Sequence, residues 1–343
     1  MKILTLSVFL YATTAAAQEA PGGFAAAVTD GQKTTERVLR GVADPESDTA
    51  VTQETVFHVA SLSKQITAAA LAMAIVEGKL ALDDPLSKHI PEAKHYGKTP
   101  TLAHLMYFTS GLTEAYDLPR KGGVPWVTQY HFTVDDAIAA SLSVRKLQFT
   151  PGSQWRYNNI NFQLLAEVVE RAYRKPFSAV VREKIFTPLG MTRSLIHDDI
   201  TAVVPGHAPG VLARSPEAVE QLRSVGIHAA STGGPILIRR NAPHYGGSGV
   251  LTTIDDWMRW ERAMLGRKVF PARFWTLMFS TRKFAHSKSN DAFGLVHGSY
   301  QGTPMVWFAG GDIDASSYML ASSEAGIASA RQSKPGVLEK HAE

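Results

Sequence analysis

A serine and a lysine three positions apart are the residues of this chain that could act together in catalysis. The segment Ser61-Leu62-Ser63-Lys64 joins a short apolar stretch, 57–60, to a long apolar run. In a helix that begins at Ser61, positions i and i+3 share a face, so Lys64 would lie beside the Ser61 hydroxyl. A serine needs a neighbouring base to become nucleophilic, and burial can lower the pKa of a lysine enough for that role. The helix N-terminus would also stabilise an oxyanion.

Ser-x-x-Lys is a short pattern that also occurs by chance. In the alternative interpretation, Ser61 is a simple N-cap and Lys64 an exposed helix residue. The run after Lys64, QITAAALAMAIV, is apolar on nearly every face and predicts a buried central helix. A lysine that served only solubility would be out of place there, so the context favours chemistry.

Two later segments carry residues of matching chemistry. Tyr157 lies on an expected tight loop just before a helix and could relay a proton, while Asn159 could orient a substrate carbonyl or the lysine. The alternative is a half-buried aromatic ring and an N-cap. Further on, Gly310 and Gly311 end an expected strand, WFAGG, where their bare backbone would let a ligand approach closely. The alternative there is a strand that ends in a turn.

Taken in this order, the three segments resemble the serine β-lactamase and penicillin-binding-protein superfamily. The likeness is to its β-lactamase-related branch, which includes class C enzymes, D-aminopeptidases and carboxylesterases. It extends over nearly the whole chain after residue 18. The segments that carry it are 57–65 (FHVASLSKQ), 101–112 (TLAHLMYFTSGL), 151–165 (PGSQWRYNNINFQLL) and 246–260 (GGSGVLTTIDDWMRW).

The resemblance implies that Ser61 attacks a carbonyl and forms an acyl-enzyme. Lys64 and Tyr157 would share the proton transfers, and the backbone N–H groups of Ser61 and Gly311 would form the oxyanion hole. The residues it assigns to substrate binding are Asn159, Phe308, Gly310 and Gly311. It implies a small-molecule or peptide substrate and no metal or organic cofactor.

The chain departs from the family pattern in three places. Phe308 stands where the third motif usually has Lys or His, and Phe108 replaces the usual His before Thr-Ser-Gly. A phenyl ring cannot pair with a substrate carboxylate, so esters or neutral amides are expected to be preferred over β-lactams. Arg239 or Arg240 would compensate if either lay near the site. Residues 325–343 predict the last strand and only the start of the family's C-terminal helix.

Several functions stay open at this point. Esterase, β-lactamase and D-amino-acid peptidase activities are not separated. A different class is a catalytically weak binding or scaffold protein on the same fold, against which the intact set of Ser61, Lys64, Tyr157 and Asn159 argues. An α/β-hydrolase would need a Gly-x-Ser-x-Gly elbow, and a zinc protease His-Glu-x-x-His; neither occurs.

The elements that must position these residues follow a simple order along the chain. Strand patterns occur at 22–30, 35–42 and 55–60, and again at 292–299, 304–309, 315–321 and 325–330. Helical patterns occur at 61–77, 101–107, 133–142, 159–173, 177–186 and 254–264. Residues 200–246 are expected to be long surface loops around a cleft. This order predicts an α+β fold of the β-lactamase/transpeptidase type: an antiparallel sheet from about 22–60 and 290–335, flanked by helices, with a mainly helical part inserted at about 61–245.

Composition and the first residues bear on location and partners. The 343 residues are 45% apolar and carry a net charge of +4, with scattered basic residues that do not suggest a nucleic-acid partner. There is no cysteine, which excludes disulfides and thiolate chemistry. Residues 1–17 combine Lys2, an apolar stretch and a small-residue end, a signal-peptide pattern. The mature chain, 18–343, is therefore expected to be secreted or periplasmic, with no membrane span and an undetermined oligomeric state.

Overall fold

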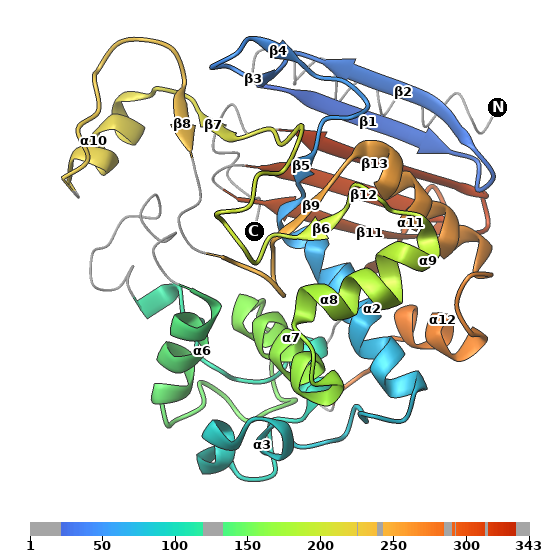
Figure 1. The fold of residues 1–343 in the computed structure, drawn as a ribbon. Helices are drawn as coiled ribbons and strands as arrows, with labels where there is room; N and C mark the ends of the chain where they lie inside the picture. Colours follow the sequence, from blue (N-terminus) through green and yellow to red (C-terminus); the bar gives the residue numbers. More distant parts are fainter. Residues whose placement is uncertain are drawn as a thin grey trace.

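An antiparallel sheet of six strands, built from both ends of the chain, supports the molecule (Figure 1). The computed structural model describes residues 22–118, 133–224, 226–238, 243–284, 290–291, 293–312 and 315–333. The strands, in spatial order, are β10 (Val296–Tyr300), β11 (Thr303–Gly311), β12 (Ser316–Ser322), β13 (Ile327–Ser333), β1 (Phe24–Thr29) and β2 (Thr34–Arg40). The junction of the two chain ends is the β1–β13 pair, in which Phe24 lies opposite Ser333. The predicted α+β fold is confirmed.

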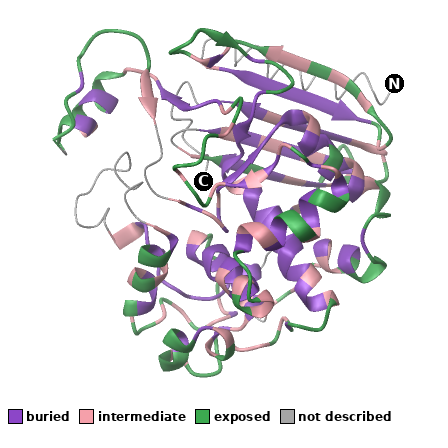
Figure 2. Cartoon of the chain, viewed as in Figure 1, coloured by how far each residue is buried: buried purple, intermediate pink, exposed green. Residues whose placement is uncertain are grey.

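Helix α2 (Ser63–Val76) runs through the centre of the molecule, as predicted (Figure 2). Twelve of its fourteen residues are buried. Its many alanines let neighbouring helices approach closely, and α7 (Asn159–Tyr173) and α12 (Ala272–Met278) pack against it. The apolar run in the sequence therefore has a direct structural reason: this helix has no face toward water.

The start of this helix differs from the prediction. The α-helical pattern begins at Ser63, whereas Ser61 lies in a 3₁₀ turn, η2 (Ala60–Leu62), that leads into it. The expected strand 55–60 is reduced to β5 (Phe57–His58). Between the two, Ala60 has a φ of 44°, in the left-handed region that non-glycine residues rarely adopt. Such strain is held only where surrounding packing enforces it, and it is common beside functional groups.

The remaining helices follow the sequence patterns where caps are present. Thr101 and Thr133 each accept a hydrogen bond from the backbone N–H three residues on, which fixes the starts of α4 and α6. The predicted helix 177–186 is split between α8 and a π-helical turn, η5. Two helices, at 216–224 and 254–266, are described below. The bounds of the other helices and helical turns in the described residues are α3 (Leu86–His89), η3 (Pro91–Tyr96), α4 (Leu102–Met106), α6 (Val134–Ser143), α8 (Phe177–Val181), η5 (Arg182–Phe186) and α9 (Thr187–Leu189).

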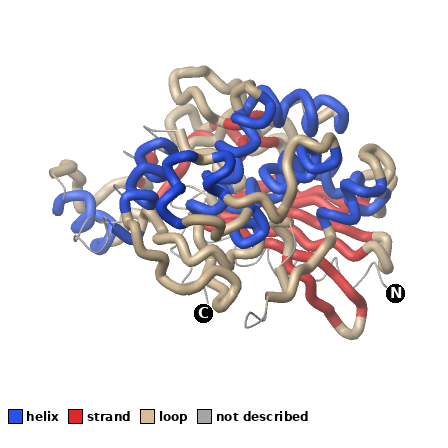
Figure 3. The backbone as a smooth tube through the Cα atoms, turned by 90° about the horizontal axis from the view of Figure 1, so that it is seen from below, coloured by secondary structure: helices blue, strands red, loops and turns tan. Residues whose placement is uncertain are grey.

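The expectation that residues 200–246 are only loops is wrong. This stretch contains a hairpin of β7 (Gly210–Leu212) and β8 (Ile236–Ile238), with α10 (Pro216–Ser224) between them. Val219 and Leu222 on α10 form a small apolar cluster of their own, which the short amphipathic pattern did not reveal. Figures 1 and 3 show α10 projecting from the rest of the chain.

Smaller sheets complete the fold. A three-stranded sheet is formed by β5, β9 (Val250–Thr252) and β6 (Leu195–Ile196). Strand β5 comes just before η2 in the sequence. The predicted strand 35–42 is broken at Gly41, which has a φ of 76°, so a separate pair forms from β3 (Val42–Asp44) and β4 (Thr49–Ala50). The glycine turns the chain where a side chain would meet backbone.

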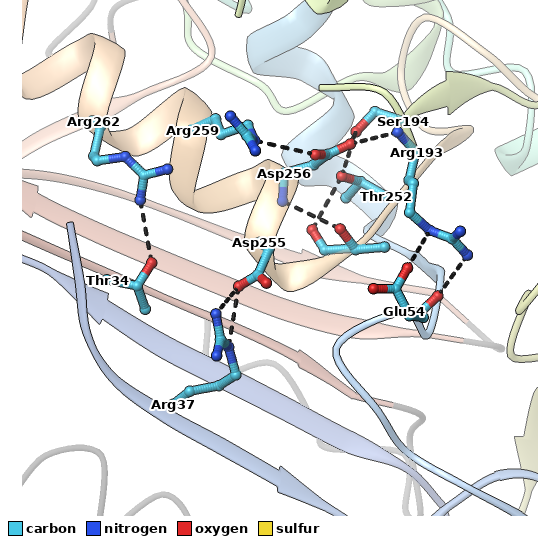
Figure 4. A network of polar contacts seen from close by, with 11 residues as sticks. Thr34, Arg37, Glu54, Arg193, Ser194, Thr252, Asp255, Asp256, Arg259 and Arg262 are labelled. Carbon is cyan, nitrogen blue, oxygen red and sulfur yellow. Dashed lines mark hydrogen bonds and ion pairs between the residues drawn. The ribbon is translucent and has the colours of Figure 1, made fainter. Parts of the chain in front are cut away.

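Helix α11 (Ile254–Gly266) is fixed across the sheet by a polar network at its N-terminus (Figure 4). Asp255 pairs with Arg37 on β2. Asp256 accepts hydrogen bonds from the Arg193 backbone N–H at 2.7 Å and from Ser194 Oγ at 3.0 Å. Carboxylates in the first turn of a helix are favourably placed toward its dipole, so this network holds the helix in position on the sheet.

Some predictions fall outside the described residues. These are the signal peptide at 1–17, the residues Arg239 and Arg240, and the chain after residue 333. Among the helices that the structure does describe, none combines the length and the apolar character needed to cross a bilayer.

Glu261 on α11 provides a test of core electrostatics. It is fully buried, accepts a hydrogen bond from Trp257 Nε1 at 2.9 Å, and burial raises its pKa well above the usual value. A raised pKa means that the folded state keeps a proton the unfolded chain loses, so stability falls as pH rises. We expect Glu261→Gln to raise Tm by about 2 °C or more at pH 8, and by less at pH 5.

Thermal unfolding followed by circular dichroism at the two pH values measures this. The exposed Glu220→Gln on α10 is the matched control and should show no such difference. An equal gain at both pH values would contradict a titrating Glu261.

Candidate active site

Four polar side chains from two distant segments meet where η2 enters α2. The Tyr157 hydroxyl lies 2.7 Å from Ser61 Oγ. Lys64 Nζ donates to Ser61 Oγ at 3.1 Å and to Asn159 Oδ1 at 2.8 Å. The structure thus brings together the four residues that the sequence singled out, Ser61 and Lys64 from one segment, Tyr157 and Asn159 from the other.

The Lys64 amine is enclosed by protein on all sides. Its side chain is 0% exposed, and a third hydrogen bond runs from Nζ to the Gly247 carbonyl at 2.7 Å. Burial, the largest effect, lowers the pKa of Lys64 to about 7, while the carboxylates of Glu114 and Asp312 act in the opposite direction. At neutral pH a large fraction of this amine is therefore uncharged.

An uncharged Lys64 has only two N–H bonds and one lone pair. The Asn159 Oδ1 and Gly247 carbonyl oxygens can only accept, so they take both N–H bonds. The lone pair then points along the remaining contact, toward Ser61 Oγ. This arrangement is suited to take a proton from the serine hydroxyl.

The Tyr157 ring forms the outer side of the site and is 37% exposed. Desolvation raises the pKa of Tyr157 most strongly, and the carboxylates of Glu114, Asp312 and Asp291 raise it further. The hydrogen bond between the Tyr157 and Ser61 hydroxyl groups opposes these effects only in part. Tyr157 is therefore a neutral phenol that can donate a proton, rather than a phenolate base.

The start of α7 sets the position of Asn159. Asn158, not Asn159, is the N-cap: its Oδ1 accepts from the Ile160 N–H at 2.9 Å, and its Nδ2 donates to the Leu112 carbonyl at 2.8 Å. The Asn159 N–H donates to Glu114 Oε2 at 2.6 Å. The alternative interpretation of Asn159 as a cap is therefore wrong, and its side chain is available to Lys64.

Glu114 is a residue of the candidate site that the sequence analysis did not single out. Its side chain is buried, and burial raises its pKa, although the N–H groups of Asn159 and Tyr116 act to lower it. It lies two residues beyond the 101–112 segment that carried the family resemblance. An acidic residue two positions after the Ser-Gly-Leu segment was the available signal, because such residues are rarely buried unless they are paired.

The end of β11 passes close to the backbone of Ser61. A Cβ on Gly310 would lie 2.8 Å from both the Ser61 nitrogen and the Val59 carbonyl oxygen, so only glycine fits. Asp312 and Ala315, at the turn between β11 and β12, form a hydrogen-bonded pair. The next pair along the two strands is Gly311–Ser316. In an antiparallel ladder this is a non-hydrogen-bonded pair, so the Gly311 N–H points away from β12.

The two aromatic substitutions noted in the sequence are both buried. Phe308 is 6% exposed and belongs to the main apolar core, on the same face of β11 as Gly310. It therefore offers little surface to a substrate. Phe108 is 1% exposed, and its ring stacks on Tyr157 with centroids 4.9 Å apart.

Other polar groups near the site have structural partners. Ser63 Oγ accepts from the Val250 N–H at 3.0 Å and is 1% exposed, so this second serine is part of the core. Within the described ranges, no group of three or more His, Asp or Glu side chains is arranged to hold a metal ion.

Comparisons with known proteins agree with this geometry. The sequence matches the family described as Beta-lactamase over residues 10–334. Among curated relatives, the chain is 30% identical to the D-alanyl-D-alanine-carboxypeptidase/endopeptidase AmpH of Escherichia coli K12, over 76% of this chain and 63% of AmpH. It is 34% identical to Esterase EstB of Burkholderia gladioli, over 45% of this chain and 42% of EstB. The chain thus spans about half the length of these relatives.

Solved structures show the same fold. The octameric penicillin-binding protein homologue from Pyrococcus abyssi has a TM-score of 0.78 at 21% identity, over 98% of this chain and 74% of that one. The D-amino acid amidase from Ochrobactrum anthropi SV3 has a TM-score of 0.75 at 20% identity, over 93% and 88%. The resemblance seen in the sequence is confirmed: this chain belongs to the Beta-lactamase family.

Proposed function

We propose that this chain is a serine hydrolase that forms an acyl-enzyme through Ser61 on an ester, amide or β-lactam carbonyl. The observation that carries the proposal is the buried Lys64 amine, 3.1 Å from Ser61 Oγ with its other two hydrogen bonds committed to acceptors. Curated relatives named as an esterase, a carboxypeptidase and a D-aminopeptidase support the same reaction class.

In the acylation step, uncharged Lys64 takes the Ser61 proton as Oγ attacks the carbonyl carbon. The oxyanion that forms is stabilised by the N–H of Ser61 at the helix start and by the N–H of Gly311, which points away from β12. When the tetrahedral intermediate collapses, the leaving atom takes a proton from the Tyr157 hydroxyl, and the Lys64 ammonium replaces it. Asn159 keeps Lys64 in place and faces the substrate.

The substrate class we favour is an ester or neutral amide. The charged groups that act on Lys64 among the described residues are both carboxylates, Glu114 and Asp312. Asp312 directly follows Gly311 at the end of β11, so it lies close to the proposed oxyanion hole. A substrate carboxylate would be repelled there, and Phe308 supplies no compensating charge.

The alternative function, a catalytically weak binding or scaffold protein, has less support. A scaffold has no need to enclose a lysine amine and lower its pKa, since burying an ionisable group costs stability.

We also propose that the chain is exported to the periplasm or medium and that residues 1–17 are its signal peptide. Lys2, the apolar stretch and the alanines before Gln18 support this.

The first prediction of this proposal distinguishes the two serines of the motif. Ser61→Ala should abolish labelling by a fluorophosphonate, because it removes the nucleophile. Ser63→Ala should retain much of it, because Ser63 Oγ serves only the Val250 N–H. Intact-mass spectrometry after labelling reads out both variants. Labelling that survives in Ser61→Ala and disappears in Ser63→Ala would show that the assignment is wrong.

The second prediction concerns pH. Because Lys64 must be uncharged to act as base and its pKa is about 7, kcat/KM for an ester should rise with pH through about 7 and then level off. Glu114→Gln removes a carboxylate that raises the pKa of Lys64, so the rise should move to lower pH.

The control for this pH profile is Glu183→Gln, which changes an exposed ion pair with Lys175. It should leave the profile unchanged. A profile that stays flat between pH 5 and 9, or that moves to higher pH in Glu114→Gln, would refute Lys64 as the base.

The third prediction tests the oxyanion hole. Gly310→Ala should push β11 away from the Ser61 nitrogen and lower kcat/KM about a hundredfold, as loss of one oxyanion donor does. Gly298→Ala on β10 is the matched control, because a Cβ there makes only ordinary contact with Trp307. Equal activities of the two variants would argue against the close approach of β11.

A further inference from the structure

Two exposed aromatic side chains lie on the loop whose Tyr157 contacts the proposed nucleophile. Among the described residues, three Phe, Tyr or Trp side chains are exposed: Trp155 (44%), Tyr157 (37%) and Tyr300 (49%). Two of these are only two positions apart, in the loop that carries the Tyr157 hydroxyl to Ser61. Exposed apolar surface that gathers at one place commonly marks a binding site.

The two rings share one buried neighbour, Phe108. Arg156, between them, has other partners: its guanidinium contacts Asp117 at 3.3 Å, and its backbone N–H donates to the Phe108 carbonyl at 2.8 Å. Beneath the two exposed rings lies buried Phe108, which stacks on Tyr157 at 4.9 Å and meets Trp155 edge-on at 6.0 Å. Trp155 and Tyr157 therefore rest on a common base and present their other surfaces outward.

Trp155 is held in place without being buried. Its indole Nε1 donates a hydrogen bond to Asp291, a carboxylate that is only 7% exposed. A tryptophan that served the core alone would not leave 44% of its surface in water. A ring that is fixed at its edge and open on its surface is preorganised to receive a flat apolar group, because little freedom is lost on binding.

The chemistry of the site indicates which part of the substrate this surface receives. In the proposed function, on which this inference rests, the Tyr157 hydroxyl protonates the leaving atom from its position 2.7 Å from Ser61 Oγ. The leaving group must therefore depart on the Tyr157 side. Trp155 lies two residues before Tyr157 in the same loop, and its ring contacts the same Phe108 that the Tyr157 ring stacks on.

We infer that Trp155 and the Tyr157 ring form a binding site for an aryl or arylalkyl leaving group of the ester or amide. Aromatic groups prefer offset-stacked or edge-on contact with such rings, which the exposed surfaces permit. The patch consists of two side chains, far less than a protein partner would need, so a small flat group is the fitting occupant.

The test compares substrates that differ on one side of the carbonyl only. Benzyl acetate and ethyl acetate differ in the leaving group, whereas ethyl phenylacetate and ethyl acetate differ in the acyl group. Trp155→Ala should lower the benzyl-to-ethyl ratio of kcat/KM about fivefold or more, mainly through KM. Trp155→Phe should lose less, and the ratio for the two acyl groups should change less than twofold.

Two controls keep the outcome interpretable. Tyr300→Ala removes the exposed aromatic residue on β10 and should leave both ratios unchanged. Trp155→Ala should still be labelled by the fluorophosphonate at Ser61, which shows that the nucleophile is still activated in this variant.

The results separate this inference from the proposed function. If the unchanged protein is neither labelled at Ser61 nor active on any of these esters, the proposed function fails. If it is labelled and active, but Trp155→Ala leaves the leaving-group ratio intact or lowers the acyl ratio instead, the leaving-group site is refuted and the hydrolase stands.

Discussion

The site depends on excluding water from one lysine amine that lies beside a serine hydroxyl. Removing a charge from water is costly, so burial lowers the pKa of an amine and it loses its proton more readily. The apolar helix α2 supplies the enclosure, and three oxygen atoms lie within hydrogen-bond distance of Lys64 Nζ. Glu114 and Asp312 oppose the burial, and together these effects bring the pKa to about 7. A purely apolar surrounding would lower the pKa of Lys64 further and leave a weaker base. A surrounding open to water would leave an ammonium that cannot accept a proton.

That enclosure requires backbone segments far apart in the chain to touch. Gly310 at the end of β11 reaches the nitrogen of Ser61, and a Cβ on Gly247 would lie 3.5 Å from Lys64 Nζ. The strain at Ala60, with its φ of 44°, lies at the same junction. Interiors are packed closely enough that such contacts have no slack, so the sheet, η2 and α7 form one rigid frame. The frame, more than any single side chain, sets the distances around Ser61.

Features with a local cause in the sequence could be predicted, whereas features imposed by contacts between distant segments could not. Helix α7 has the predicted bounds because its apolar period and its N-terminal signal are local, and the buried α2 follows from composition alone. The 3₁₀ turn at Ser61 did not follow, because tertiary contacts impose it. The burial of Phe308 and the role of Glu114 were missed for the same reason: both depend on which distant segment packs against them. Motif spacing selected four side chains that the fold brings together, and only the fold shows the charges around them.

The two aromatic departures from the family pattern share one structural feature. Phe108 and Phe308 are both buried, and neither side chain carries a polar group that would need a partner there. Phe108 packs against Tyr157 by ring stacking, with the ring centroids 4.9 Å apart. Phe308 removes the cation that would attract a carboxylate and leaves Asp312 and Glu114 to set the local field. Under the proposed function, one titrating amine, two carboxylates and an aromatic rim favour a substrate without a negative charge near its carbonyl, selected by apolar contact.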